Sequence, residues 1–266
     1  MQQRALRSAP SLDGRPAMTH ADTFQDLSRD GQISPDATQR LATQGFVVIS
    51  GPSVAGGIER VQAAYDTAVA TADVADVRIA SSTRVTDFVN RSVEFDSLYV
   101  YPPLLAACCE VIGRPFKLSN TCARTLNPGA AAQNLHVDVK HGGDGWPLVG
   151  YIWMIDAFNT ENGATRFVPG SHLRRYGPDE HSSEAAVNSD EATLACGPAG
   201  SLIVFNASVW HGHTANRSAH RRRSVQGHFV ARDATAAIDY RARMQPETLC
   251  RIRDLARYLL DLPGPV

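Results

Sequence analysis

Two side chains that can bind a metal ion lie close together in the segment 134–141, which reads NLHVDVKH. His136 and Asp138 are separated by one residue, so both leave the same face if this segment is a β-strand. A His-x-Asp pair also arises by chance, and His20 with Asp22 forms a second one near the N-terminus. The pair therefore indicates a metal site only if a third ligand and a suitable fold accompany it.

The third candidate ligand is His211, which follows the apolar segment 201–206. Two histidines and one carboxylate occupy one face of an Fe(II) ion and leave three adjacent positions open for a bidentate 2-oxo acid and dioxygen. The far carboxylate of such an acid needs a fixed cation, and the planar guanidinium of arginine makes two parallel bonds to a carboxylate. Arg222, eleven residues after His211, is the candidate. On a strand it shares one face with Ser224, Gln226 and His228.

The rest of the chain predicts the elements that position these residues. Helices are expected over 34–44 with Ser34 as N-cap, over 57–72, over 92–113 with an interruption near Pro102–Pro103, and over 245–260. A strand is expected over 46–50, and further β-rich segments at 116–127, 134–140, 148–158, 165–170, 201–206 and 221–232. Short strands separated by Gly, Pro and Asn favour an antiparallel sandwich or barrel, so the predicted class is mainly β with flanking helices.

Composition limits the function classes. The chain has 266 residues, 43% hydrophobic and 20% charged, with a formal net charge of −1. This balance favours neither nucleic acid nor an anionic membrane as a partner, and we expect a small-molecule substrate instead. No uninterrupted apolar run approaches the roughly 20 residues that cross a bilayer. Five cysteines without a CxxC motif argue against a disulfide framework or structural zinc, and predict a reduced, cytoplasmic protein.

The domain organisation is expected to be simple. Residues 1–20 are polar, carry no apolar segment of a secretory signal, and predict a disordered tail in which Met18 is an alternative start. Residues 21–266 show no linker between the helical and the β-rich parts, so a single domain is expected. The oligomeric state does not follow from the sequence.

The combined pattern of motifs resembles a known family. His-x-Asp at 136–138, NGATRFVPGSH at 162–172 and H-x-x-x-x-N-x-S-x-x-x-R at 211–222 look like the phytanoyl-CoA dioxygenase family of Fe(II)/2-oxoglutarate oxygenases, over about residues 116–232. The resemblance implies a double-stranded β-helix core of the jelly-roll, cupin-like type. It also implies iron ligands at His136, Asp138 and His211, and a 2-oxoglutarate contact at Arg222. Gln133 is a further candidate cosubstrate contact, and His213 stands where family members often carry a small hydroxyl residue.

The same resemblance implies an activity. The expected enzyme uses Fe(II), 2-oxoglutarate and O₂, and hydroxylates or otherwise oxidises by hydrogen abstraction an unactivated C–H bond, releasing succinate and CO₂. A carboxylate at Asp138 implies hydroxylation rather than halogenation, because a halide would need that ligand position vacant. The family acts on fatty acyl-CoA, amino acids and secondary metabolites, so the substrate stays open. Specificity is expected from segments 81–92, 141–147 and 173–198 over the barrel mouth, the last as a lid.

Several alternatives stay open at this point. A cupin-like metal enzyme that does not use 2-oxoglutarate, or a non-catalytic ligand-binding barrel, would share the fold. His141 is an alternative third ligand, and His172 is expected to be structural. Of the arginines 221–223, the outer two are expected in solvent and the middle one inside. Four further arginines could meet an anionic substrate but are expected to be solvated: Arg84, Arg91, Arg174 and Arg175.

Overall fold

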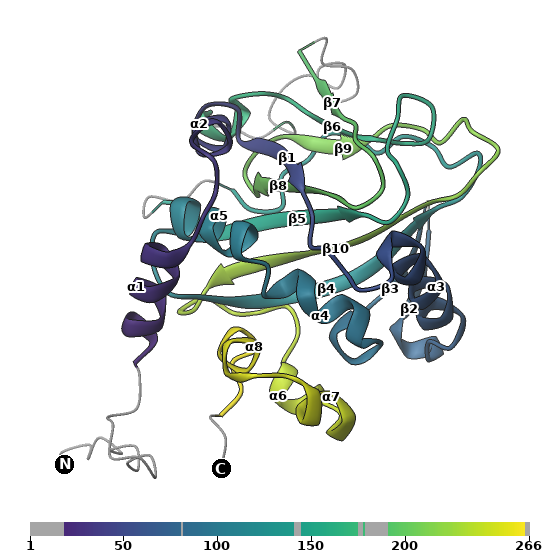
Figure 1. Cartoon of the computed structure of the whole chain (residues 1–266). Helices are drawn as coiled ribbons and strands as arrows, with labels where there is room; N and C mark the ends of the chain where they lie inside the picture. The colour runs from purple at the N-terminus through teal and green to yellow at the C-terminus, as the bar shows by residue number, and fades with distance from the viewer. Residues whose placement is uncertain (1–18, 81, 141–144, 175–177, 179–190, 264–266) are drawn as a thin grey trace, which may run out of the picture.

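The chain is built around one large antiparallel sheet, whose central strands run across Figure 1 one below another. The computed structural model describes residues 19–80, 82–140, 145–174, 178 and 191–263. The large sheet has seven strands, and every neighbouring pair is antiparallel. Their spatial order is β1 (Phe46–Ser50), β8 (Ser201–Asn206), β5 (Leu148–Met154), β10 (Arg222–Ala231), β4 (Phe116–Leu126), β3 (Thr83–Val85) and β2 (Val77–Ile79).

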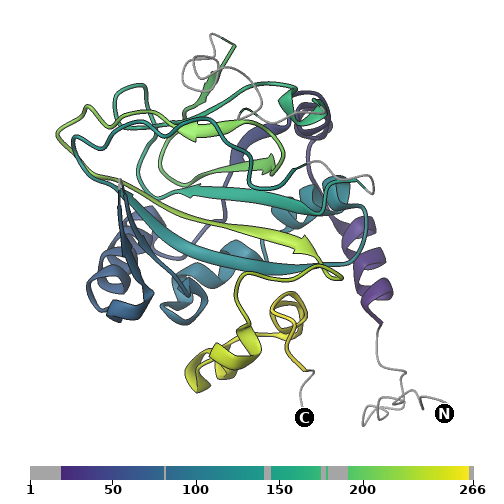
Figure 2. The same ribbon diagram turned by 180° about the vertical axis from the view of Figure 1, so that it is seen from behind.

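A second sheet of three short strands lies over one face of the large sheet (Figures 1 and 2). Its order is β7 (Thr193–Ala195), β6 (Thr165–Phe167) and β9 (His211–His213), again antiparallel. Two facing antiparallel sheets with helices outside agree with the mainly β, double-stranded β-helix core that the sequence predicts. The candidate site lies between the two sheets.

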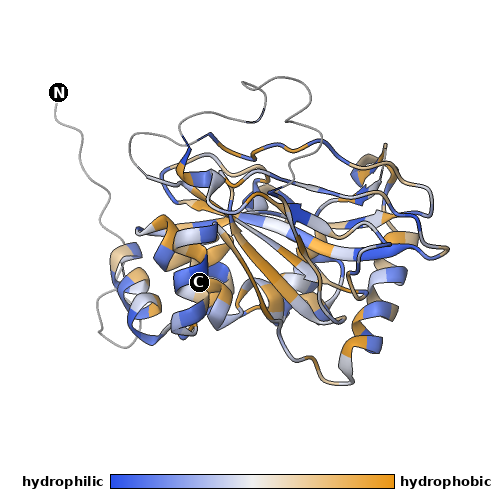
Figure 3. Cartoon of the chain, turned by 90° about the horizontal axis from the view of Figure 1, so that it is seen from above, coloured by the Kyte–Doolittle hydropathy of each residue, from blue (hydrophilic) through white to orange (hydrophobic). Residues whose placement is uncertain are grey.

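Alternating side chains in the central strands give the large sheet two buried faces. In β8, Leu202 and Val204 join the large apolar cluster on the helix side, whereas Ile203 and Phe205 join a second cluster between the sheets. The strand β5 alternates in the same way, with Tyr151 and Trp153 toward the helices and Ile152 and Met154 between the sheets. Figure 3 shows apolar residues concentrated in these central strands. A sheet buried on both faces requires such near-continuous apolar strands.

A bulge in β4 changes which residues of that strand face the site. His228 of β10 pairs with Asn120 and the next residue, Phe229, pairs with Leu118, so Ser119 is an extra residue on β4. Before the bulge, Phe116 and Leu118 pack on the helix side, whereas after it Ala123 does. The even-numbered residues that follow Ser119 are thereby turned to the site side, and Arg124 is one of them.

Most helices cover the face of the large sheet that lies away from the small sheet, whereas α2 lies beside β1 at the edge of the large sheet (Figures 1 and 2). They are α1 (His20–Asp30), α2 (Pro35–Gln44), α3 (Gly57–Ala70), α4 (Asp96–Tyr99), α5 (Pro102–Ile112), α6 (Tyr240–Arg243), α7 (Pro246–Arg251) and α8 (Asp254–Leu259). As predicted, the Ser34 side chain caps α2 by accepting a bond from the Ala37 amide, and Gly45 ends the helix in the left-handed region at φ +84°. Short 3₁₀ turns are η1 (Val74–Asp76), η2 (Phe88–Asn90), η3 (Val93–Phe95) and η4 (Ser171–Leu173).

The structure corrects several expected elements. Residues 134–140 are not a strand; they form one isolated bridge, between His136 and His211, and then bend away. The helix expected over 245–260 is two short helices, because the chain is extended at Ile252 and Arg253. Helix α1, with a capping box from Thr19 and Asp22, begins at His20 inside the range assigned to a tail, while residues 1–18 lie outside the described part.

One described helical stretch, Val93–Ile112, is long and apolar enough by length and composition alone to cross a membrane. In the fold it comprises η3, α4 and α5, with a break at Val100 and Tyr101. Buried residues of α5, including Leu104, Leu105 and Cys108, belong to the main apolar cluster. These contacts are those of a core helix, because its apolar face is already covered by protein.

Candidate metal centre and arginine-rich pocket

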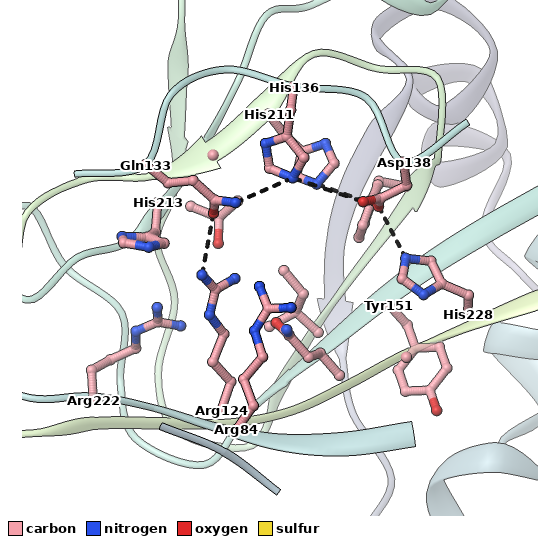
Figure 4. Close-up of a pocket in the computed structure, with 16 residues that line it drawn as sticks. Arg84, Arg124, Gln133, His136, Asp138, Tyr151, His211, His213, Arg222 and His228 are labelled. Atoms are coloured by element: carbon pink, nitrogen blue, oxygen red, sulfur yellow. Dashed lines mark hydrogen bonds and ion pairs between the residues drawn. The ribbon is translucent and has the colours of Figure 1, made fainter. Parts of the chain in front are cut away.

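Three potential metal ligands converge at the site between the sheets (Figure 4). One ligand atom from each of His136, Asp138 and His211 lies within 4.8 Å of the others. His136 Nε2 is 3.8 Å from Asp138 Oδ1, and His211 Nε2 is 3.4 Å from Asp138 Oδ2. The set is two imidazoles and one carboxylate, the ligand types that suit Fe(II) in a facial arrangement.

Backbone hydrogen bonds hold the ligand segment beside β9 although it is not a strand. The amide of His136 donates to the His211 carbonyl at 3.0 Å, and the His211 amide donates back at 3.0 Å. The Asp138 amide donates to the Ala207 carbonyl at 2.9 Å, and the Gln133 amide to the His213 carbonyl at 2.9 Å. Residues far apart in sequence are thus fixed side by side by main-chain bonds, which do not depend on the ligand side chains.

Both histidines present the same nitrogen to the centre. His211 Nδ1 lies 3.0 Å from the Val209 carbonyl, and His136 Nδ1 lies 3.2 Å from the Asn134 carbonyl. Because a carbonyl only accepts, each Nδ1 carries the hydrogen and each Nε2 keeps its lone pair for a metal. The ring orientation is therefore set before any metal binds.

The protonation states also suit metal binding. Burial lowers the pKa of His211 to about 4, although Asp138 acts in the opposite direction, so the imidazole is neutral at neutral pH. Burial works to raise the pKa of Asp138, but the neighbouring His211 and His228 outweigh it and hold that pKa well below its ordinary value. A neutral imidazole and an ionised carboxylate are the ligating forms of these groups.

Arg222 enters the same pocket from the start of β10. It is 1% exposed, its guanidinium lies 4.2 Å above the ring of Phe158, and its Nε has no hydrogen-bond partner. Burial lowers its pKa to about 9, with a further contribution from Arg124, so the group is still a cation at neutral pH. A buried cation with an unused donor is the group expected opposite the carboxylate of a bound ligand.

Gln133 and His213 also line the pocket. Gln133 Oε1 accepts from Arg124 at 3.3 Å, and its Nε2 lies 3.4 Å from His136 Nε2. His213 Nδ1 lies 2.9 Å from the Thr214 carbonyl, while its buried Nε2 has no partner. Burial, followed by the nearby Arg124 and Arg222, lowers the pKa of His213 to about 4. Its free nitrogen therefore offers a lone pair rather than the hydroxyl hydrogen common at this position in the family it resembles.

Comparison with known proteins decides the family. The sequence profile described as Phytanoyl-CoA dioxygenase (PhyH) matches residues 41–224, which is more than half of the chain. The chain belongs to the phytanoyl-CoA dioxygenase (PhyH) family. Dioxygenase trt7 of Aspergillus terreus is 28% identical over 212 residues, covering 73% of this chain and 72% of that protein. Dioxygenase cdmA of Talaromyces verruculosus is 33% identical over 101 residues, which span only about a third of either chain, 35% of this one and 32% of that one.

Solved structures of low sequence identity share the fold of this PhyH family member. HygX from Streptomyces hygroscopicus, crystallised with nickel and 2-oxoglutarate, aligns with a TM-score of 0.63 at 16% identity, covering 77% of this chain and 90% of that one. EctD from S. alaskensis with bound Fe aligns with a TM-score of 0.62 at 17% identity, covering 76% and 78%. The expected double-stranded β-helix of the PhyH family is thereby confirmed.

Sequence reasoning on this PhyH family member missed two pocket residues and undervalued a third. Arg124, which the β4 bulge turns inward, lines the pocket and is 8% exposed. His228 was placed on the Arg222 face but given no role, and its Nε2 lies 3.0 Å from Asp138 Oδ2. Arg84 is exposed, as expected, and it also lines the pocket beside Arg124 (Figure 4). Strand β3, which carries Arg84, gave no clear pattern in the sequence.

Other expected positions have different outcomes. Arg91 and Arg174 are not pocket residues, since they pair with Asp76 and Glu191. Arg223 was expected in solvent, but its side chain is 12% exposed and pairs with Asp156. His172 is buried, with Nε2 3.2 Å from the Ala42 carbonyl, which fits a structural role. His141, Arg175 and most of the segments 141–147 and 173–198 lie outside the described residues.

Proposed function

We propose that this chain is an Fe(II)- and 2-oxoglutarate-dependent hydroxylase of a small organic molecule. The reaction is substrate–H + 2-oxoglutarate + O₂ → substrate–OH + succinate + CO₂. The observation that carries the proposal is the meeting, in one pocket, of the ligand set His136, Asp138 and His211 with the buried, unpaired cation Arg222. Other products of hydrogen abstraction, such as a desaturated one, would use the same residues.

The donor set fits iron. His136 Nε2, His211 Nε2 and an Asp138 oxygen are free to ligate, because each Nδ1 is engaged by a backbone carbonyl. Three protein ligands on one side leave adjacent positions for a bidentate cosubstrate and dioxygen. When bound, Fe(II) and 2-oxoglutarate supply the oxidising chemistry, in which 2-oxoglutarate becomes succinate and CO₂ as dioxygen is reduced and a substrate hydrogen is removed.

The chain's own residues bind and orient 2-oxoglutarate. Arg222 pairs with the distal carboxylate of 2-oxoglutarate, and its unused Nε supplies one of two parallel bonds. Gln133, which lies between His136 and Arg124, is a second polar contact for the cosubstrate. Phe205 and Ile152 line the pocket beside them and keep water from the reacting atoms.

The alternatives explain fewer features. A cupin-like metal enzyme without 2-oxoglutarate uses the ligand set but leaves the buried Arg222 unexplained, because burying an unpaired guanidinium costs free energy. A non-catalytic barrel explains neither the converging ligands nor the arginine. We place the reaction in the cytoplasm, which the five free cysteines support: Cys108, Cys109, Cys122, Cys196 and Cys250.

The test needs no substrate. Under nitrogen, Fe(II) and 2-oxoglutarate are added to metal-free protein and the visible charge-transfer band of the chelate is recorded. The wild type is expected to show the band, His211→Ala to lose it, and Arg222→Gln to need about tenfold or more 2-oxoglutarate, consistent with one charge-assisted pair. Arg221→Gln is the matched control. Arg221 is the neighbour of Arg222 in the sequence, but its side chain is 53% exposed and pairs with Asp66 outside the pocket.

Two results would redirect the assignment. Iron binding without a band in the wild type would exclude 2-oxoglutarate chelation and favour the cupin-like enzyme. Absence of iron binding, with the protein folded, would leave the ligand-binding barrel. In air, the wild type is also expected to form succinate slowly from 2-oxoglutarate without added substrate, and His211→Ala is expected to form none.

A further inference from the structure

We propose that a second cavity, framed by Lys117, Arg232 and Arg241, binds the oxyanion group of a small molecule that carries a phosphate or a carboxylate. The inference is independent of the proposed function, because it uses none of the residues assigned to iron or 2-oxoglutarate. Among the described residues, this cavity and the metal pocket share no lining residue.

The cavity lies where two C-terminal helices meet the ends of two central strands (Figure 1). Its walls come from the start of β4, the loop 232–239 after β10, the start of α6 and the residues that follow α8. Its volume is about 420 Å³, which is within the range of small-molecule sites. Four segments that are far apart in the sequence therefore enclose a space large enough for such a ligand.

Hydrogen bonds to the bulge residue of β4 hold the loop that forms one wall of the cavity. Ser119 Oγ accepts a bond from the Ala237 amide at 3.0 Å, and the Ser119 carbonyl accepts one from the Ile238 amide at 2.9 Å. The Ala234 amide donates to the Ala231 carbonyl at 2.9 Å and closes a turn directly after β10. The loop is thus fixed by bonds within the protein, and a ligand would not have to order it.

Three cations from three of these segments converge on one carboxylate. Asp261 Oδ1 lies 2.8 Å from Arg232 Nη1 and 3.2 Å from Arg241 Nη2, and Asp261 Oδ2 lies 3.6 Å from Lys117 Nζ. The side chains of Arg232 and Lys117 are only 11% and 14% exposed, so water screens them poorly. Three positive charges against one negative charge leave an excess of two around Asp261, which favours an anion as the ligand.

The other two carboxylates that line the cavity are engaged elsewhere. Asp233 is 71% exposed and lies 3.6 Å from Arg114 Nε. Asp239 Oδ1 accepts a bond from the Arg241 amide at 3.0 Å and so caps α6. Among the described residues, neither carboxylate forms an ion pair with the three cations of the cavity. They reduce the net charge of the region but leave the side-chain donors of Lys117 and Arg241 available.

Lys117 and Arg241 keep donors for a ligand. Lys117 Nζ is 3.6 Å from the carboxylate of its ion pair, too far for a hydrogen bond, and it makes no other bond within the described part of the chain. Arg241 uses Nε and Nη2 for Asp261 and leaves Nη1. Arg232 is held by the fold, because its Nη2 bonds to the Tyr258 carbonyl. An ammonium and a guanidinium with unused hydrogens are the groups that bind phosphate and carboxylate oxygens.

The effect of the cations extends to the neighbouring His20. Its ring centroid lies 5.6 Å from that of Tyr258, at the side of the cavity formed by the end of α8. Burial, followed by Arg232, lowers the pKa of His20, and Arg241 adds to this effect, whereas Asp261 opposes it. The effect of Arg232 alone is larger than that of Asp261, so the cations outweigh the carboxylate at His20.

The experiment reads binding from the wall of the cavity itself. The backbone ¹H–¹⁵N NMR signals of Thr235 and Ala236, which line the cavity, are followed in the ¹⁵N-labelled full chain. Inorganic phosphate and acetate are titrated separately at constant ionic strength. Binding of either anion in the metal pocket does not interfere, because the observed amides belong to the second cavity.

The proteins compared are the wild type, Lys117→Gln, Arg241→Gln and the control Arg253→Gln. Arg253 lies directly before α8 and is exposed, and it does not line the cavity. We expect saturable shifts with at least one anion in the wild type and in the control. The affinity should be about tenfold weaker in Lys117→Gln and in Arg241→Gln, as for the loss of one charge-assisted bond.

The anion that binds more tightly identifies the ligand group as a tetrahedral oxyanion or a carboxylate. Shifts that do not saturate with either anion in the wild type would overturn the inference. Equal affinity in all four proteins would also overturn it, because the anion would then bind without the two cations assigned to it.

Discussion

His228 Nε2 lies 3.0 Å from Asp138 Oδ2, and the other ring nitrogen of His228 lies 3.0 Å from Asn120 Oδ1. A carboxylate only accepts, so Nε2 carries the hydrogen of this contact. A neutral ring then requires the Asn120 amide to present its NH₂ to Nδ1, an orientation that the oxygen and nitrogen of an amide can exchange. His228 thus holds one oxygen of the candidate ligand in place, and β4 holds His228.

Removing this contact is expected to weaken iron binding. In His228→Ala, Asp138 loses the donor that fixes its rotamer, and partners of this kind typically contribute 10–100-fold in metal affinity. We expect Fe(II) affinity to fall by about that factor, while the 2-oxoglutarate band still forms at saturating iron. Anaerobic Fe(II) titration measures the affinity. His220→Ala, on the exposed turn before β10, is the control, and an unchanged affinity in His228→Ala would remove the positioning role.

The stability of the metal-free protein is expected to fall as the pH is lowered. Burial holds the pKa of His211 and of His213 at about 4, below the ordinary 6.5. Between these values the unfolded chain binds protons that the folded chain does not, so the free energy of unfolding decreases as pH falls from 6.5 toward 4. The loss is on the order of 2 kcal/mol for each histidine at the acidic end.

Urea unfolding in the presence of a chelator, at pH 7.5 and at pH 4.5, measures this dependence. Asp138 does not interfere, because a carboxyl whose pKa is lowered contributes stability that is lost only below its ordinary pKa of 3.8. The variant His213→Gln removes one of these two histidines. It should reduce the pH dependence of the free energy of unfolding that His211 and His213 cause together by about half. Equal slopes for this variant and the wild type would contradict the assignment.

The sequence was sufficient for the parts of the site that depend on residue type and spacing. His136, Asp138, His211 and Arg222 were selected because each type suits one role, and all four line one pocket. The strand expected around His136 is absent, yet the residues still converge, because main-chain bonds between this segment and β9 replace the missing ladder. These residues therefore meet in one pocket although the strand predicted around His136 does not form.

The sequence did not predict which face of the sheet a side chain points to where a β-bulge or a short strand decides it. Simple alternation from Phe116 and Leu118 would turn Arg124 toward the helices, and only the extra residue Ser119 reverses it. Nothing in a single sequence marks that residue as a bulge. Arg84 was considered only as a solvated residue for a related reason, since β3 has only three residues and its direction is set by pairing with β4.

A methyl group added at Gly150 is expected to disturb the site through Phe205. Gly150 lies directly opposite Phe205, and a Cβ there would clash with the Phe205 ring. The ring cannot move freely, because its other contacts include His211 at 4.8 Å and Phe167 at 5.4 Å between ring centroids. Gly150→Ala should therefore cost about 1–3 kcal/mol of stability and also weaken Fe(II) binding.

A double-mutant cycle checks the cause of that cost. Phe205→Leu, which removes the clashing ring edge, is expected to make Gly150→Ala less damaging than it is in the wild type. The free energies of unfolding of the two single variants and the double variant give the coupling, which should be favourable by about 1 kcal/mol. Additive effects would place the damage of Gly150→Ala elsewhere than at Phe205.

Three consecutive arginines are expected to respond differently to substitution. Arg223 is 12% exposed and forms paired bonds to Asp156, from Nη2 to Oδ1 at 2.7 Å and from Nε to Oδ2 at 3.0 Å. Arg223→Ala leaves Asp156 without these bonds and should cost about 3 kcal/mol of stability, without changing the 2-oxoglutarate band. The side chain of Arg221 is 53% exposed, so Arg221→Ala should cost less than about 1 kcal/mol of stability.

Arg222→Gln is expected to have the opposite effect to Arg223→Ala: it should change 2-oxoglutarate binding without lowering the stability. Its guanidinium is buried without a carboxylate partner among the described residues, so replacing it removes a desolvated charge and should leave the stability of the ligand-free protein unchanged or higher. The 2-oxoglutarate requirement should rise, and 2-oxoglutarate should stabilise the variant less than the wild type. Urea unfolding with and without 2-oxoglutarate separates the two effects. A large loss of stability in the ligand-free variant would mean that Arg222 is held for the fold and not for a ligand.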